Sequence, residues 1–367
     1  MKEKDMTDEE NRALSFIDEL NEYKRQGEPD KAEKSIIWQT AIGLQQTDGL
    51  RPSTYLVETA KQNIDGDITF DEVKRRLDSY YIERPIRPEE SDRVEEADKV
   101  SARIAEILSE RTFNFGPTEY IMIHKRLFTG IYGFAGKIRD YNISKAEWVL
   151  GGKTVYYSSA DIIQATLDYD LKQERTFSYK GLTKEQTSEH LVKFVSALWQ
   201  IHAFGEGNTR TTAVFMIKYL RKLGFEVTND LFAEHSWYFR NALVRANYTD
   251  LKNGVHSTYE YLDRFFGNLI LGENNVLRNR DLLMTDVENK AQNKAQNKAQ
   301  SASAGMTPTE AAVMAFLKGR PNATQIEASV AIGVSRRTVQ MTISSLMEKR
   351  IIERVGSKKT GEWVVKR

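Results

Sequence analysis

The 367-residue sequence contains no cysteine, few prolines and no long apolar run. Without cysteine, disulfides, thiol catalysis and thiolate metal ligands are excluded, and the composition fits a reducing compartment, so we expect a cytoplasmic location. No run of about 18 apolar residues is present to cross a bilayer, so no membrane partner is expected. The 53 Lys+Arg nearly balance the 52 Asp+Glu, which leaves the whole chain without a general attraction for polyanions.

The length predicts two or three domains. Residues 289–305 contain NKAQ three times and then a Ser/Ala/Gly-rich stretch. They have no apolar stripe to bury, which is typical of a linker. A second boundary is expected at Pro85 and Pro88, which interrupt helix. The expected division is a helical module at 1–84, a central domain at 86–288, the linker, and a domain at 306–367.

Hydrophobic periodicity predicts a mainly α chain. The candidate helices of the central domain are 119–127, 159–171, 184–200, 210–223 and 236–252. One segment from residue 139 differs: RDYNISKAEWVLGGKTVYYSS. Its β-branched and aromatic residues flank Gly151-Gly152, which predicts a two-stranded hairpin.

The most informative segment is 201–212, which reads IHAFGEGNTRTT. It is a loop entering a helix, where free backbone N–H groups and the helix dipole favour an anion. Gly205 and Gly207 allow close approach of a phosphate, and Arg210 offers a bidentate fork for its oxygens. Glu206 suits Mg²⁺ carried with that phosphate, because a carboxylate can share the cation with substrate oxygens.

His202 is expected beside the phosphates, where it can remove a proton from an incoming hydroxyl. Asn208 can donate to a further oxygen. This layout suits nucleotidyl or phosphoryl transfer. The alternative is an ordinary glycine-containing loop, whose histidine is hydrogen-bonded within the protein and whose arginine lies at the surface.

Residues 202–210, HAFGEGNTR, closely resemble the Fic family signature H-x-F-x-[D/E]-G-N-x-R. The resemblance spans about residues 90–275 and includes IHKRLFTGIYGFAGKIRDYNISK and ALWQIHAF. It implies a Fic helical fold with a β-hairpin flap. In the commonest case the family transfers AMP from ATP to a Ser, Thr or Tyr hydroxyl of a target protein.

The resemblance implies a role for each matching position. His202 is the general base, Phe204 a packing anchor and Glu206 the Mg²⁺ ligand. The phosphate-binding set is Gly205, Gly207, Asn208, Thr209 and Arg210. The hairpin resembles the flap that holds the target by strand addition, and Asn247 follows the ALxxAN pattern near the adenine, with a plain helix-surface residue as the alternative.

Two positions depart from the family pattern. Thr209 stands where many members have Gly, and Ala213 stands where many have a second Arg. The second departure opens the question of how the outer phosphates are held and whether ATP is the preferred donor.

The amino-terminal module resembles the antitoxin-like helical module of some Fic proteins, whose inhibitory helix carries [S/T]-x-x-x-E-[G/N]. Asp48-Gly49 takes the acid-Gly place, but Leu44 falls where Ser or Thr is expected. We expect Asp48 to restrain Arg210; a purely structural module is the alternative.

The last domain carries its own charge: residues 306–367 hold 11 Lys+Arg and 5 Asp+Glu, a net +6. The pattern predicts a winged helix-turn-helix, with Thr324 and Ser335 as helix caps, Gly333 in the turn and a wing around GSKKTG. The expected contacts with duplex DNA are Arg336, Arg337, Thr338, Gln340, Lys358 and Lys359. Protein docking, self-association and an inert appendage are the alternatives.

The sequence therefore predicts a Fic adenylyltransferase with ATP and Mg²⁺, an unidentified target protein and possible self-modification. Two alternatives stay open. One is a DNA-binding regulator whose Fic domain senses nucleotide, and the other is a Fic enzyme that transfers another phosphate-linked group.

Overall fold

The computed structural model describes residues 28–83, 90–227, 230–284, 308–334, 336–355 and 362–366. It divides into two compact units, with the division between residues 290 and 291. The predicted linker 289–305 lies outside the described residues, as does the predicted boundary near residue 85.

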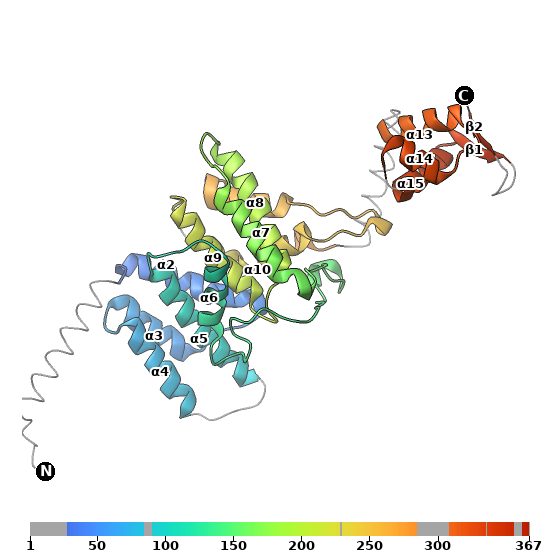
Figure 1. The fold of residues 1–367 in the computed structure, drawn as a ribbon. Helices are drawn as coiled ribbons and strands as arrows, with labels where there is room; N and C mark the ends of the chain where they lie inside the picture. The colour runs from blue at the N-terminus through green and yellow to red at the C-terminus, as the bar shows by residue number, and fades with distance from the viewer. Residues whose placement is uncertain are drawn as a thin grey trace, which may run out of the picture. The chain divides into compact units, whose positions relative to one another are not determined.

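The first unit is helical (Figure 1). Its first half contains α2 (Lys31–Gly43), η1 (Leu44–Asp48), α3 (Thr54–Asp65), α4 (Phe70–Ile82), α5 (Glu90–Ser109) and α6 (Pro117–Phe128). Its second half contains η2 (Trp148–Leu150), η3 (Ala160–Ile162), α7 (Ile163–Thr176), α8 (Lys184–Ile201), α9 (Asn208–Lys222), α10 (Asp230–Ala246), η4 (Leu251–Asn253), α11 (Glu260–Phe266), the π-helical η5 (Gly267–Leu271) and η6 (Asn279–Leu282).

The amino-terminal helices share one apolar core with the rest of this unit. Ile37, Trp38 and Leu44 are buried in the same cluster as Phe215 on α9 and Phe239 on α10. Helix α2 packs against both α5 and α10, and the backbone of Ala233 lies so close to Gly43 that a side chain there would clash. Residues 28–83 are therefore an integral layer of the first unit.

Asp98, a buried aspartate on α5, connects this layer to the rest of the first unit. Asp98 accepts hydrogen bonds from the Ser53 backbone N–H at 2.7 Å and the Tyr81 hydroxyl at 2.6 Å. Burial raises the pKa of Asp98, although the hydrogen bonds from Ser53 and Tyr81 act to lower it. Because Ser53 also caps α3 through the Leu56 N–H, one carboxylate ties the start of α3 to the core.

Two expectations for the central domain need correction. The segment 139–159 turns at Gly151-Gly152, both with positive φ, but it forms no β ladder; the chain contains the short η2 helix instead. Buried Glu147 organises it: its backbone carbonyl accepts a hydrogen bond from the Gly152 N–H, and its carboxylate accepts one from the Tyr157 hydroxyl. The loop is thus shaped by tertiary contacts rather than strand pairing.

The second correction concerns the helix expected at 236–252. Helix α10 ends at Ala246, and the Asn247 side chain bonds back to the Leu243 carbonyl at 2.9 Å. The chain then forms an isolated bridge between Asp250 and Val255. The helix expected at 159–171 similarly begins with the 3₁₀ turn η3 and becomes α-helical at Ile163.

The second unit contains α13 (Pro308–Gly319), α14 (Gln325–Ile332), α15 (Arg336–Glu348), β1 (Ile352–Val355) and β2 (Glu362–Val365). Thr324 caps α14 in a capping box with Glu327, and Gly333 ends it with φ 75°. Strands β1 and β2 pair antiparallel, with Ile352 opposite Val365. Helix, turn, helix and wing therefore occur in the predicted order, while Ser335 and the wing tip lie outside the described residues.

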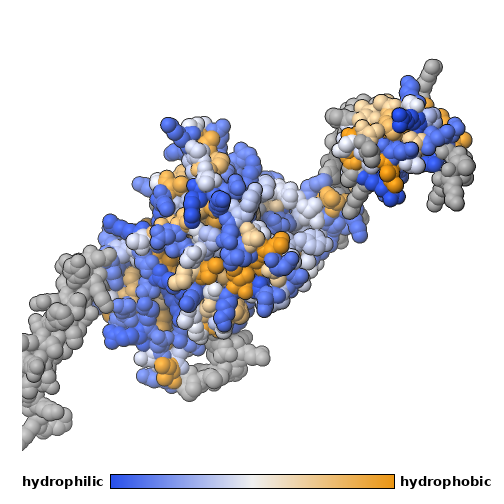
Figure 2. Space-filling view, in the orientation of Figure 1, coloured by the Kyte–Doolittle hydropathy of each residue, from blue (hydrophilic) through white to orange (hydrophobic). Residues whose placement is uncertain are grey.

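The surface of the described chain is mainly hydrophilic on the face shown in Figure 2, with apolar side chains in patches. In the described segments, no helix combines the length and apolar character that a membrane crossing needs.

Candidate active site

The candidate site is the loop between α8 and α9. Helix α8 begins with a capping box at Thr183 and ends at Ile201. His202 then takes a left-handed conformation, φ 49° and ψ 58°, which costs a non-glycine residue about 1–3 kcal/mol. Gly207, with φ 77°, starts α9. The first N–H groups of α9, which have no acceptor within their own helix, thus open onto this loop.

Gly207 is required for space as well as conformation. An added Cβ would lie 2.3 Å from the Phe128 ring. The same ring lies under the Arg210 guanidinium, 4.8 Å from ring centroid to Cζ. Phe128 therefore holds the glycine turn and the arginine one helical turn later in a fixed relation.

Arg210 is completely buried and held by three side chains from other elements. Nη2 donates to Glu96 of α5 at 2.6 Å, and Nη1 donates to Gln45 of η1 at 2.9 Å. Nε lies 2.7 Å from Asp48 Oδ2, close enough for an ion pair but without hydrogen-bond alignment. Burial opposes the charged form, but the carboxylates of Asp48 and Glu96 outweigh it and raise the pKa of Arg210.

The predicted pairing of Asp48 with Arg210 is thus present in the structure. Glu96 and Gln45 were not predicted as partners. A signal for Glu96 exists in the sequence, since it is a charged residue beside the buried Ala97 on the apolar side of an amphipathic helix. Gln45 lies in a short 3₁₀ segment and carries no comparable signal.

His202 is buried among aromatic rings, with the Tyr157 ring 4.1 Å and the Trp199 ring 5.1 Å from the imidazole. Its Nδ1 lies 3.3 Å from the Trp199 carbonyl. A carbonyl only accepts hydrogen bonds, so Nδ1 carries the proton and Nε2 is the basic nitrogen. Burial, followed by the charge of Lys145, lowers the pKa of His202 well below its usual value.

Arg139, at the start of the flap segment (139–159), holds the histidine in place. It donates to the His202 carbonyl at 2.8 Å, to the Tyr141 carbonyl at 2.6 Å and to the Ser158 carbonyl at 2.5 Å. Both ends of the flap segment are therefore tied to the loop by one guanidinium. The sequence does not predict Arg139 as a site residue.

A second histidine, His124, supports the loop through a hydrogen bond to its backbone. His124 Nδ1 accepts from the Gly136 N–H at 2.8 Å, so Nε2 carries the proton and donates to the Glu206 carbonyl at 3.0 Å. The His124 and Phe204 rings stack with centroids 3.7 Å apart. Phe204 is fully buried, in keeping with its predicted role as a packing anchor.

Burial, the largest cause, lowers the pKa of His124 to about 4. In the unfolded chain this histidine binds a proton near pH 6.5, whereas in the folded chain it does so only near pH 4. The contribution of His124 to the free energy of unfolding is therefore fully present above pH 6.5 and is lost as the pH falls towards 4. The loss from this group is about 3 kcal/mol.

In urea unfolding between pH 7.5 and 4.5, we expect His124→Gln to have a lower free energy of unfolding than wild type at pH 7.5 and a weaker dependence of that free energy on pH. His256→Gln, a change at an exposed histidine, should keep the wild-type pH dependence; equal slopes for all three proteins would contradict this account.

Asn208 and Thr209 are engaged within the protein. The Asn208 side chain accepts from the Phe204 N–H at 2.9 Å and donates to the Phe204 carbonyl at 2.7 Å. Thr209 accepts from the Trp199 indole at 3.0 Å. Both residues shape the loop, and the amide of Asn208 keeps a single hydrogen for a phosphate oxygen.

Glu206 is the exposed carboxylate of the loop. Half of its side chain is accessible, and its Oε2 lies 3.0 Å from Nζ of Lys145 in the flap segment. The described residues contain no group of three or more side chains arranged as a metal site. A magnesium ion carried by a nucleotide needs only one or two protein carboxylates, so Glu206 fits the Mg²⁺ ligand that the sequence predicts.

Gly205 and Asn247 complete the predicted set. An added Cβ at Gly205 would lie 2.7 Å from the Tyr141 hydroxyl, so this position accommodates the flap segment. Asn247 donates to the Ser196 hydroxyl of α8 at 3.0 Å. The structure thus gives Asn247 a role in joining the end of α10 to α8; contact with adenine stays a prediction.

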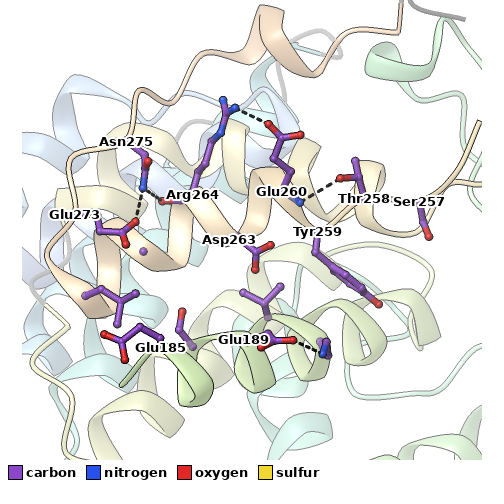
Figure 3. Close-up of a pocket in the computed structure, with 15 residues that line it drawn as sticks. Glu185, Glu189, Ser257, Thr258, Tyr259, Glu260, Asp263, Arg264, Glu273 and Asn275 are labelled. Carbon is purple, nitrogen blue, oxygen red and sulfur yellow. Dashed lines mark hydrogen bonds and ion pairs between the residues drawn. The ribbon is translucent and has the colours of Figure 1, made fainter. Parts of the chain in front are cut away.

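Two cavities lie outside the loop between α8 and α9, and none of the motif residues 202–210 lines either of them. One, of about 880 Å³, lies between the flap segment and residues 248–252 and is lined by Lys145, Lys153 and Tyr156. The other, of about 790 Å³, lies between α8 and α11 and contains none of the motif residues (Figure 3). In the second, charged groups pair with each other, as Arg264 does with Glu260 and Lys193 with Glu189.

In the second unit, α15 presents the predicted DNA-contacting residues. Arg336, Thr338 and Gln340 are exposed, whereas Val339 between them is buried. Of Arg337 only the helical backbone is described, and Lys358 and Lys359 lie outside the described residues.

The loop thus brings together a neutral buried imidazole, a helix N-terminus and a buried arginine, an arrangement suited to chemistry at phosphate esters. Residues 114–220 match the Fic/DOC family model. Residues 304–361 match the MarR family model. The chain therefore contains a region that matches the Fic/DOC family model, followed by a winged-helix region that matches the MarR family model.

Among characterised proteins, the protein adenylyltransferase VbhT of Bartonella schoenbuchensis is 27% identical over 140 residues. The match covers 35% of this chain and 28% of that protein, so this chain spans little more than a quarter of the relative's length.

Two solved structures illustrate the structural neighbours. The N-terminal Fic domain of a Bartonella effector protein from Bartonella sp. AR 15-3 shows 21% identity and a TM-score of 0.41, covering 51% of this chain and 84% of that one. A Fic family protein from Desulfovibrio desulfuricans G20 shows 15% identity and a TM-score of 0.39, covering 92% of this chain and 87% of that one. Both TM-scores are below 0.5, so these likenesses are weak.

Proposed function

We propose that the first unit transfers AMP from ATP to a Ser, Thr or Tyr hydroxyl of a protein. The observation that carries the proposal is the placement of His202, buried and neutral with Nε2 unprotonated, at the end of α8 beside the open N-terminus of α9. The similarity to a protein adenylyltransferase supports the choice of AMP as the transferred group.

In the proposed reaction the acceptor oxygen attacks the α-phosphorus of ATP. The bond from that phosphorus to the bridging oxygen breaks, pyrophosphate leaves, and the hydroxyl proton passes to Nε2 of His202. The backbone N–H groups at the start of α9 stabilise the charge on the phosphoryl oxygens. Glu206 would hold Mg²⁺, which supplies charge neutralisation for the phosphates when bound.

We further propose that the resting protein is restrained at Arg210. Its guanidinium is engaged by Asp48, Glu96 and Gln45 and is completely buried. An arginine saturated by two carboxylates has little capacity left for phosphate oxygens. Loss of the Asp48 contact would leave Nε of the Arg210 guanidinium free to bind the nucleotide.

The test of transfer uses the full chain with Mg²⁺ and ATP labelled at either the α- or the γ-phosphate, with intact mass as a second readout. AMP transfer predicts incorporation of the α-label alone and a matching mass increase. Incorporation of the γ-label would instead indicate phosphoryl transfer. A protein that binds ATP yet labels neither itself nor lysate proteins after restraint is removed would favour the nucleotide-sensing alternative.

A second candidate function, DNA binding by the winged helix, is favoured by the exposed Arg336 and Gln340, one helical turn apart on α15. We expect the full chain to bind duplex DNA at low salt and to lose affinity steeply as salt rises. Arg336→Ala should weaken binding about tenfold, whereas Lys318→Ala, a matched loss of an exposed charge on α13, should have little effect. Gel-shift titrations in 50 to 200 mM salt test this, and absence of binding at the low end would leave docking or self-association as the role of the second unit.

A further inference from the structure

The charges around the candidate site leave a triphosphate short of cationic partners. Arg210 is the only positive side chain that the family signature itself contributes, and it faces the carboxylates of Asp48 and Glu96. Glu206 adds a third negative charge at the same loop. Ala213, one turn after Arg210, is fully buried and carries no charge.

Other described cations near His202 are committed to the fold. Arg139 is buried and donates to four backbone carbonyls. Arg240 forms a 2.8 Å ion pair with fully buried Glu147, and breaking such a pair leaves an uncompensated buried charge. Neither can turn towards a nucleotide without disturbing the flap segment.

Lys145 differs from both. Its Nζ contacts the exposed carboxylate of Glu206 at 3.0 Å, and about a quarter of its side chain is accessible. Its backbone is fixed through the N–H bond to Thr154 Oγ1 at 3.0 Å, while four methylene groups let the ammonium move. It also lines the 880 Å³ cavity beside the flap segment, and its charge acts on the His202 imidazole.

We propose that Lys145 is a nucleotide-binding residue, which exchanges its partner Glu206 for a phosphate oxygen when ATP enters with Mg²⁺. In the resting protein the ammonium neutralises Glu206. Once Glu206 turns to the metal, the ammonium remains within reach of the loop and compensates for the absence of charge at Ala213. The inference rests on ATP being the substrate and concerns how it is held.

The test measures the dissociation constant of Mg²⁺-ATP by calorimetry in the full chain carrying Asp48→Asn and His202→Ala, which removes the Asp48 charge from Arg210 and prevents turnover. Lys145→Ala should weaken binding about 10- to 100-fold, the range for one charge-assisted hydrogen bond, and Lys145→Arg should restore most of the affinity. Lys153→Ala is the matched control, since Lys153 lies in the same flap segment and lines the same cavity but pairs with Asp250 at 3.0 Å; its effect should stay within about twofold.

Unchanged or tighter binding in Lys145→Ala would overturn the proposal, because it would mean that Lys145 only neutralises Glu206. So would equal losses in the Lys145 and Lys153 variants, or no ATP binding in the parent. Transfer is scored separately in the Asp48→Asn chain with His202 intact. Binding that depends on Lys145 without AMP transfer would reject the enzymatic function alone, and AMP transfer with binding insensitive to Lys145 would reject this inference alone.

Discussion

His202→Ala is expected to lower AMP transfer by about 10²- to 10⁴-fold, the usual contribution of a positioned general base. The structure gives the physical reason: Nδ1 faces the Trp199 carbonyl, and Nε2 is the basic nitrogen. Incorporation of α-labelled ATP and the mass of the product measure the loss, best in a chain carrying Asp48→Asn so that wild-type transfer is large.

ATP binding serves as the control for this variant. We expect the dissociation constant of Mg²⁺-ATP to change by no more than about threefold, because the imidazole accepts a proton from the acceptor and is not needed to hold phosphate. An alanine variant that transfers AMP at the rate of its parent would exclude His202 as the base. One that loses ATP binding as well would assign His202 a structural role in the loop.

Asp48→Gly is expected to raise AMP transfer about 10- to 100-fold, the range for release of one charge-assisted contact. The carboxylate lies 2.7 Å from Nε of Arg210, and the side chain is mostly buried in the resting protein. Asp48→Asn removes the charge but keeps the size of the side chain, so it should give a smaller rise in AMP transfer. The measurement is the initial rate of label incorporation into the protein itself and into lysate proteins.

Asp65→Asn provides the matched control, because Asp65 lies in the same amino-terminal layer and pairs with Lys31 at the surface. Its transfer rate should equal that of the wild type. Equal rates in the Asp48 variants and the wild type, with unchanged thermal midpoints, would mean that this layer is structural. Point variants are preferable to removal of residues 1–84, since Ile37, Trp38 and Leu44 belong to the core of the first unit and their loss would destabilise the whole unit.

Several features of the site could be predicted because they are local. The end of α8 near His202 and the start of α9 follow from two glycines between amphipathic stretches. The capping box at Thr324 and the turn at Gly333 follow from adjacent residues in the same way. Asp48 was predicted because Asp48-Gly49 takes the acid-Gly place of a family pattern, and the ion pair with Arg210 is present.

Other features could not be predicted, because they depend on which elements pack together. Gln45 and Glu96 contact Arg210 from 165 and 114 residues away. Lys145 reaches Glu206 across 61 residues. The same limit explains the error at 139–159, where buried Glu147 and Arg240 shape the loop in place of the strand pairing that its β-branched residues suggested.

The sequence by itself determined the helical character of this protein, the winged-helix pattern of its last domain and the position of the glycine-containing loop between α8 and α9, since periodicity, capping and glycine position act over a few residues. Only the tertiary structure decided that Arg210 is engaged by two carboxylates, that the amino-terminal layer shares the core, and that Lys145 contacts Glu206. The reason is that the energy of an ion pair or of apolar burial depends on distance in space, which neighbouring residues along the chain do not specify.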